Sequence, residues 1–166
     1  MESKAKFAGH PIHQMLIVFP LGLLATATVF DGIAAATGNR RWYDASYRMI
    51  GSGVVSGLVA AVPGAIDFLA IPCNTRARRI GLLHGLGNVA LMGLFAASWM
   101  SRQHRPSKPT RSAVALSTAA TLGAVVTGWL GGELVDRLSV GVDDDAHLDA
   151  SNSLRRESVD LSRIPA

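Results

Sequence analysis

Histidines and carboxylates stand inside or at the ends of the apolar stretches of this 166-residue chain. His10 and His13 lie at the mouth of the first stretch, and His84 lies near the start of the third, with Asn88 one helical turn later. Neutral imidazole is a good ligand for haem iron and for other transition metals. A charged side chain at the centre of a membrane helix costs about 2.5–3.5 kcal/mol on insertion scales, so polar residues in such places usually serve a function or pair with one another.

Four apolar stretches, each near or above the roughly 20 residues that cross a bilayer as a helix, must position these side chains. They cover about residues 15–37, 47–71, 80–100 and 113–134. The loops between them are short, which makes consecutive helices antiparallel neighbours. The sequence therefore predicts an all-α, integral membrane four-helix bundle over residues 1–142. It also predicts a polar, disordered C-terminal tail over residues 143–166.

The composition agrees with a membrane protein. Apolar residues make up 49% of the chain and charged residues only 17%, against about 25% charged in soluble domains. The net charge is +4, but the basic residues lie between the apolar stretches, as in membrane loops, so no nucleic-acid partner is expected. The single cysteine, Cys73, excludes an intrachain disulfide and a cysteine-based metal site.

Threading the four spans through a bilayer places most of the polar residues in one shallow layer. Spans one and three begin on the side that carries both termini, and spans two and four end there. The residues that fall in this layer are His13, Asp67, His84, Asn88 and Glu133. Asp31 alone lies near the opposite rim, and we expect it to cap a helix or to pair with a neighbour at that rim.

The layer has three interpretations. In the first, Asp67 and Glu133 bond to loop arginines such as Arg76 or Arg79, the histidines act as donors, and the layer only locks the helices of a non-enzymatic scaffold. In the second, histidines bind a cofactor, which is haem b or, with a carboxylate, a non-haem metal. In the third, the layer is the proton or ion site of a transporter subunit, although no polar path continues across the bilayer.

The sequence ranks a redox-associated membrane subunit first among the positive functions, and it shows no nucleophile with a base beside it that would make an enzyme. His10 and His13 share one helical face if the helix begins before Gly9. Pro11 instead favours an extended His10 and a turn that leads into the helix.

Three pairs of glycines, each four residues apart, predict close helix packing. They are Gly53 and Gly57, Gly81 and Gly85, and Gly128 and Gly132. In lipid, small residues at this spacing let two helix backbones approach each other. The pairs serve contacts within one chain or between two copies in a homo-oligomer.

The segment GHPIHQMLIVFPLGLL from Gly9 resembles the opening of the bacterial membrane domain-of-unknown-function 2231 family. Later matches are AVPGAID from Ala61, LHG from Leu83 and GWLGGELV from Gly128, so the resemblance covers about residues 9–142. It implies a four-span protein of the bacterial inner membrane. Fusions of family members to Rieske-type or cytochrome-like domains imply a redox setting with a partner of that kind. The family supplies no proven ligands, and Gln14 departs from its pattern, which often has a second proline there.

Overall fold

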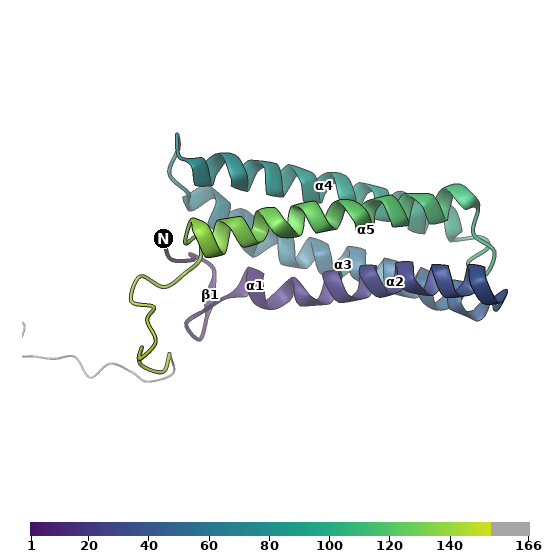
Figure 1. The fold of residues 1–166 in the computed structure, drawn as a ribbon, viewed down its shortest axis with the longest axis horizontal. Helices are drawn as coiled ribbons and strands as arrows, with labels where there is room; N and C mark the ends of the chain where they lie inside the picture. Colours follow the sequence, from purple (N-terminus) through teal and green to yellow (C-terminus); the bar gives the residue numbers. More distant parts are fainter. Residues whose placement is uncertain (154–166) are drawn as a thin grey trace, which may run out of the picture.

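The computed structural model describes residues 1–153, and four long helices run side by side through it (Figure 1). A short hairpin precedes them, formed by β1 (Lys6–Phe7) and β2 (His10–Pro11). The helices are α1 (Ile12–Leu16) with α2 (Val18–Thr37), then α3 (Arg41–Ala70), α4 (Arg76–Arg102) and α5 (Arg111–Gly132), which ends in the π-helical turn η1 (Glu133–Arg137). The predicted all-helical bundle is confirmed.

Four of the described helical segments are long and apolar enough to cross a membrane. They begin up to six residues before the predicted spans, because the helices continue into the polar surface region where hydropathy no longer marks them. Side-chain caps fix two of these earlier starts: Thr75 accepts from the backbone N–H of Arg78, and Thr110 accepts from that of Ala113. Residues 143–153 of the predicted tail form turns without helix or strand, and residues 154–166 lie outside the described part of the chain.

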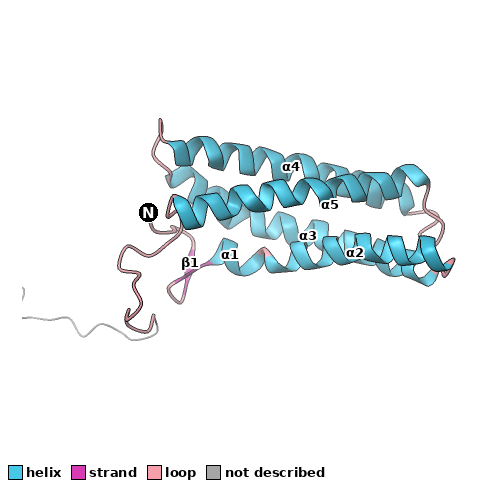
Figure 2. Ribbon diagram, viewed as in Figure 1, coloured by secondary structure: helices cyan, strands magenta, loops and turns pink. Residues whose placement is uncertain are grey.

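Prolines shape the first helix. Pro11 has an extended backbone and directly precedes Ile12, so His10 lies in the strand and not on the helix. His10 and His13 therefore do not share one helical face, and the chain instead turns into the helix after an extended His10. A break at Ile17 separates α1 from α2 (Figure 2), close to Pro20, which cannot donate a helical hydrogen bond to Leu16.

The bundle has two distinct ends. The terminal face carries the N-terminal hairpin, the α3–α4 connection and η1, and the loop face carries the α2–α3 and α4–α5 connections (Figure 1). Within the bundle, α2 packs chiefly on α3 and α4 on α5, while α3 contacts α4 and α2 contacts α5. The helices α2 and α4 therefore occupy diagonal corners, as do α3 and α5 (Figure 1).

The two helical hairpins repeat one design. Three buried residues of α2 have buried counterparts in α4, each 71 residues later along the chain. Leu24, Ala27 and Asp31 correspond to Phe95, Ser98 and Arg102. The last of these corresponding pairs, Asp31 and Arg102, is also bonded. A second constant offset relates four buried residues of α3 to four of α5: Ser46, Ile50, Gly53 and Ala60 to Ala113, Ser117, Ala120 and Thr127. Because equivalent positions of the two hairpins are buried alike, the hairpins are related by an approximate twofold axis that runs along the bundle.

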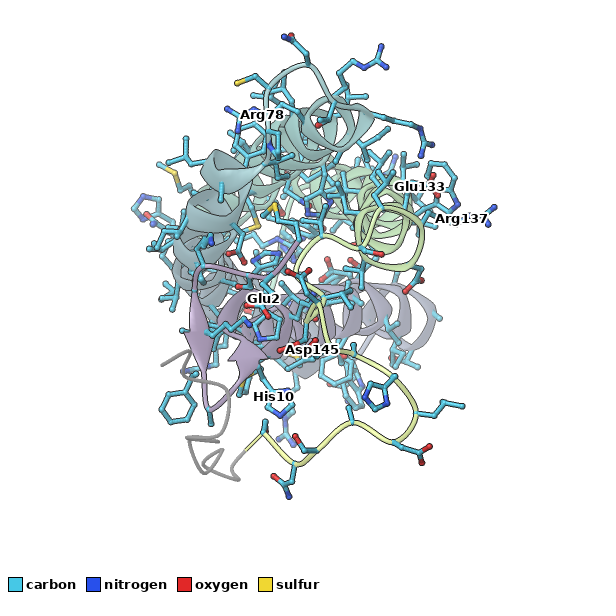
Figure 3. All side chains as sticks on the ribbon, turned by 90° about the vertical axis from the view of Figure 1, so that its left-hand side faces the viewer. Glu2, His10, Arg78, Glu133, Arg137 and Asp145 are labelled. Atoms are coloured by element: carbon cyan, nitrogen blue, oxygen red, sulfur yellow. The ribbon has the colours of Figure 1, made fainter. Side chains whose placement is uncertain are left out.

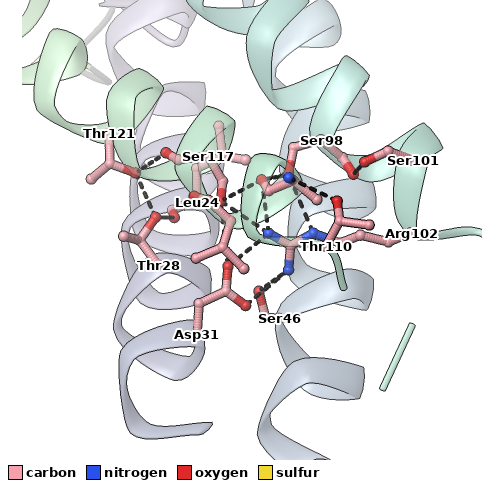
Figure 4. Close-up of polar contacts among 12 residues, drawn as sticks. Leu24, Thr28, Asp31, Ser46, Ser98, Ser101, Arg102, Thr110, Ser117 and Thr121 are labelled. Atoms are coloured by element: carbon pink, nitrogen blue, oxygen red, sulfur yellow. Dashed lines mark hydrogen bonds and ion pairs between the residues drawn. The ribbon is translucent and has the colours of Figure 1, made fainter. Parts of the chain in front are cut away.

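A buried ion pair joins these hairpins near the loop face. The guanidinium of Arg102 binds both carboxylate oxygens of Asp31 at 2.8 Å, and the two side chains are 0% and 1% exposed (Figure 4). Such a bidentate pair has the geometry of the strongest charge-assisted hydrogen bonds. The expectation that Asp31 pairs with a neighbour near this rim is therefore met, but the pair is enclosed by the helices.

Hydroxyl and carbonyl groups complete the surroundings of Arg102. Its guanidinium also donates to the hydroxyls of Ser46, Ser98 and Ser117 and to the carbonyl of Ala113. These groups come from α3, α4 and α5, and Asp31 comes from α2, so this single network touches all four long helices (Figure 4). Among the described residues, no buried side-chain nitrogen or oxygen is left without a partner. A hydrophobic core of Leu24, Ala27, Ile50, Phe95 and Ala120 lies beside the network.

We expect Asp31→Asn to lower the free energy of unfolding by about 3–5 kcal/mol, because it leaves the buried guanidinium without a counter-charge. Replacing both partners, as in Asp31→Leu with Arg102→Leu, should recover most of that loss, because no charge then remains buried. Reversible unfolding in mixed micelles measures both effects. Equal instability of the single and the double variant would contradict a dominant role for the ion pair.

Candidate functional site

Two histidines meet near the terminal face of the bundle. His13 of α1 and His84 of α4 have ring centroids 6.4 Å apart and ring planes at 86°. Both side chains are half-buried. They occupy equivalent positions of the two hairpins, each with the same spacing to the buried charge of its own hairpin, Asp31 or Arg102. The structure therefore brings together the two histidines that depth along the spans placed in one layer.

The backbone of α3 holds the ring of His13. Its Nδ1 lies 2.8 Å from the carbonyl oxygen of Ala60. Gly64, one turn further along, lets the ring approach, since a Cβ there would lie only 2.7 Å from Nδ1. Pro63 stands between these two residues inside the helix, where a proline removes one backbone hydrogen bond and loosens the local ladder. The segment around Pro63 and Gly64 thus forms a cradle for one imidazole.

The backbone of α5 holds His84 in the same way. Its Nδ1 lies 2.9 Å from the carbonyl oxygen of Thr127, and a Cβ at Gly131 would lie 3.1 Å from its Cε1. Ala60 and Thr127 are equivalent positions of the repeat, and so are Gly64 and Gly131. Each hairpin therefore carries one histidine, one carbonyl acceptor and one glycine in the same arrangement.

These carbonyl contacts define the chemistry of both rings. A carbonyl oxygen only accepts, so Nδ1 must carry the proton, and Nε2 of the neutral ring keeps its lone pair. Nε2 of His84 lies 3.2 Å from the Asn88 amide nitrogen, which can donate to it. Within residues 1–153, Nε2 of His13 has no hydrogen-bond partner. Two lone pairs on neighbouring imidazoles are the donor set of a metal or haem iron site.

Asp67 binds the N-terminal segment, so the expectation that it bonds to Arg76 or Arg79 was wrong, and it does not join the histidine pair either. Its carboxylate accepts from the Ser3 hydroxyl at 2.8 Å and from the backbone N–H groups of Lys4 and Ala5 at 2.7 and 3.2 Å. Both Asp67 and Ser3 are buried. This carboxylate therefore fixes the chain that leads into β1.

Glu133 and His10 lie apart from the pair. Glu133 bonds to Arg76 at 2.6 Å, as the locking interpretation expected, whereas a part for Arg79 in that lock stays a prediction. His10 is exposed in β2, and its Nε2 is 3.3 Å from the Ser153 hydroxyl (Figure 3). Among the described residues, no three histidine, cysteine, aspartate or glutamate side chains gather as a metal site.

The two ends of the described chain are joined on the terminal face. The Met1 amino group donates to the Ser139 carbonyl at 3.0 Å, and the Lys6 ammonium lies 3.6 Å from Asp143. A hydrogen bond to Glu2 raises the pKa of Lys6, and a hydrogen bond from the backbone N–H of Asp145 lowers the pKa of Asp143. The ion pair between Lys6 and Asp143 is therefore lost when the pH falls through the lowered pKa of Asp143 or rises through the raised pKa of Lys6.

Sequence reasoning missed the part played by Arg102. Arg102 directly follows the third apolar stretch, so hydropathy places it among the basic residues between the stretches. The signal that could have identified it was the repeat, in which Arg102 stands where the first hairpin has Asp31. The contact between Asp67 and backbone amides had no comparable signal, since every residue except proline carries such a donor.

We expect Gly64→Ala to lower the free energy of unfolding by about 1–3 kcal/mol, the usual cost of overpacking, because the new methyl group must displace the His13 ring. Gly85→Ala is the matched control, since no atom lies within 4 Å of a Cβ there. Thermal unfolding in one detergent compares the two variants. Equal stability of both would show that His13 is not held against the α3 backbone.

Comparison with known proteins gives one match. No curated protein and no solved structure matches the chain. A family model described as a predicted membrane protein, DUF2231, matches residues 9–144, which include all four membrane-spanning segments. The chain therefore belongs to the DUF2231 family of membrane proteins.

Proposed function

We propose that this domain is a redox-associated membrane subunit that binds one haem b between His13 and His84. The observation that carries the proposal is the pair itself: two imidazoles from diagonal helices, with centroids 6.4 Å apart and each with Nδ1 on a backbone carbonyl. Each ring keeps an Nε2 lone pair, which is the donor that haem iron or another transition metal takes from neutral imidazole. The closeness of the two rings supports a ligand that both histidines hold together.

The residues present fit such a ligand chemically. His13 and His84 would hold the haem through neutral imidazole, and the haem would supply reversible one-electron transfer. The carbonyls of Ala60 and Thr127 would orient the rings and increase the basicity of Nε2, which is the usual effect of a hydrogen bond from the other ring nitrogen. Asn88 would have to release Nε2 of His84, because that nitrogen would become the ligand.

Two other interpretations have less support. A non-haem metal would need a carboxylate beside the histidines, but Asp67 and Glu133 bond elsewhere. Ion transport would need a continuous polar path between the histidine pair and Asp31. Leu24, Ala27 and Phe95 of the hydrophobic core lie between them, and the hydroxyls of Thr28 and Thr121 bond to each other there at 2.6 Å. Both facts favour a local site near one membrane surface.

A membrane scaffold without a cofactor is the second candidate. The saturated network around Arg102 favours it, because that network stabilises the bundle without any ligand. On this account the two histidines contribute only interhelical hydrogen bonds.

The partner of the redox account would be a Rieske-type or cytochrome-like protein in the bacterial inner membrane. A homo-oligomer through glycine faces also stays a prediction, with Gly85 and Gly128 open at their Cβ positions.

A reduced-minus-oxidised absorbance spectrum of the purified protein, expressed with added haem, separates the candidates. The haem account expects the bands of a low-spin b-type haem at one haem per chain. We expect His13→Ala and His84→Ala each to abolish these bands, whereas His10→Ala, the matched control on the same membrane face, should keep them.

Folding of each variant must be checked, since both histidines also bond to a neighbouring helix. Gel filtration and helical circular dichroism provide this check. Folded wild-type protein without haem bands, and without metal by elemental analysis, would overturn the proposal and leave the scaffold.

A further inference from the structure

A groove runs along the lipid-facing side of α3. It is an open groove of about 850 Å³, and its floor is the α3 surface between Tyr47 and Val59. Phe19 of α2 lines it on one side and Trp99 of α4 on the other. The groove lies within the membrane-spanning segments, so lipid is the medium from which it would be filled.

Most of the groove is apolar. Phe19, Val55 and Val59 line it with 57%, 61% and 55% of their surfaces exposed. The hydroxyl of Ser56 is already bonded to the carbonyl of Gly53. A hydrocarbon chain is therefore the occupant that suits this part, because the groove provides apolar contact surface and few hydrogen-bonding groups.

A cation lies at the loop-face end of the groove. Arg48 is exposed there and makes no ion pair within the described residues. Beside it, the rings of Tyr47 and Trp99 stack with centroids 6.0 Å apart, in the manner of the aromatic belts found at membrane surfaces. An anionic group at the end of the hydrocarbon chain would complement Arg48.

The depths also agree. The 30 residues of α3 extend about 45 Å at 1.5 Å per residue, against a hydrocarbon core of about 30 Å. The backbone of Arg48, two turns from the start of α3, thus lies at the edge of the hydrocarbon core, and its long side chain can extend to the lipid phosphates. From Arg48 to Val59 the helix rises about 16 Å, close to the depth of one leaflet.

We propose that this groove binds one anionic phospholipid of the leaflet at the loop face. Its phosphate bonds to Arg48, and one acyl chain lies along Val55 and Val59 between Phe19 and Trp99. This inference does not depend on the histidine pair, because neither Arg48 nor the apolar residues that line the groove bond to His13 or His84.

Native mass spectrometry of delipidated protein tests the proposal. The probes are phosphatidylglycerol and phosphatidylcholine with identical acyl chains. We expect one tightly bound phosphatidylglycerol per chain, with phosphatidylcholine about fivefold weaker, the effect of one cation beside an anionic headgroup. Arg48→Gln should remove this preference, whereas Arg41→Gln, an exposed cation of the same helix outside the groove, should keep it.

A second pair of variants tests the chain-binding part. Val55→Trp fills the groove and should abolish the bound lipid. Leu58→Trp is its matched control, because Leu58 is also 61% exposed but does not line the groove. Equal binding by both tryptophan variants would overturn the proposal. So would an isoprenoid quinone in the organic extract that Val55→Trp removes, since the occupant would then be a quinone.

Discussion

The ion pair between Asp31 and Arg102 is the constraint on which the bundle depends. Burying either charge alone would cost several kcal/mol, so the pair is tolerated only where every donor of the guanidinium finds an acceptor. Those acceptors come from all four long helices. Few arrangements of two hairpins satisfy them together, and this requirement fixes which helices lie on the diagonals.

The repeat uses equivalent positions in two ways. Near the loop face, equivalent positions carry opposite charges, Asp31 and Arg102, which attract each other across the diagonal. Near the terminal face, equivalent positions carry the same residue, His13 and His84, and these rings do not neutralise each other. Two neutral imidazoles side by side are the feature on which the proposed haem site depends. The first pair joins the two hairpins through an ion pair, and the second brings two imidazoles within 6.4 Å of each other.

Much of this architecture could be predicted from the sequence. Hydropathy indicated the four spans, and counting depth along them placed His13 and His84 in one layer. The bond between Glu133 and Arg76 was also anticipated, because opposite charges at one membrane face tend to pair. The contact of Asp67 was not, because its partners are mainly backbone amides of the N-terminal segment. The burial of Arg102 depends on how the hairpins pack, which hydropathy does not report.

Exchange of the two buried charges tests the central claim most directly. The variant carries Asp31→Arg together with Arg102→Asp, and the measurements are reversible unfolding and the side-chain ¹⁵N resonances of His13 and His84. We expect the exchanged protein to be more stable than either single variant, with both histidines still protonated at Nδ1. An exchanged protein no more stable than the single variants, or native histidine resonances in the single variants, would contradict the claim that this ion pair holds the hairpins and so assembles the site.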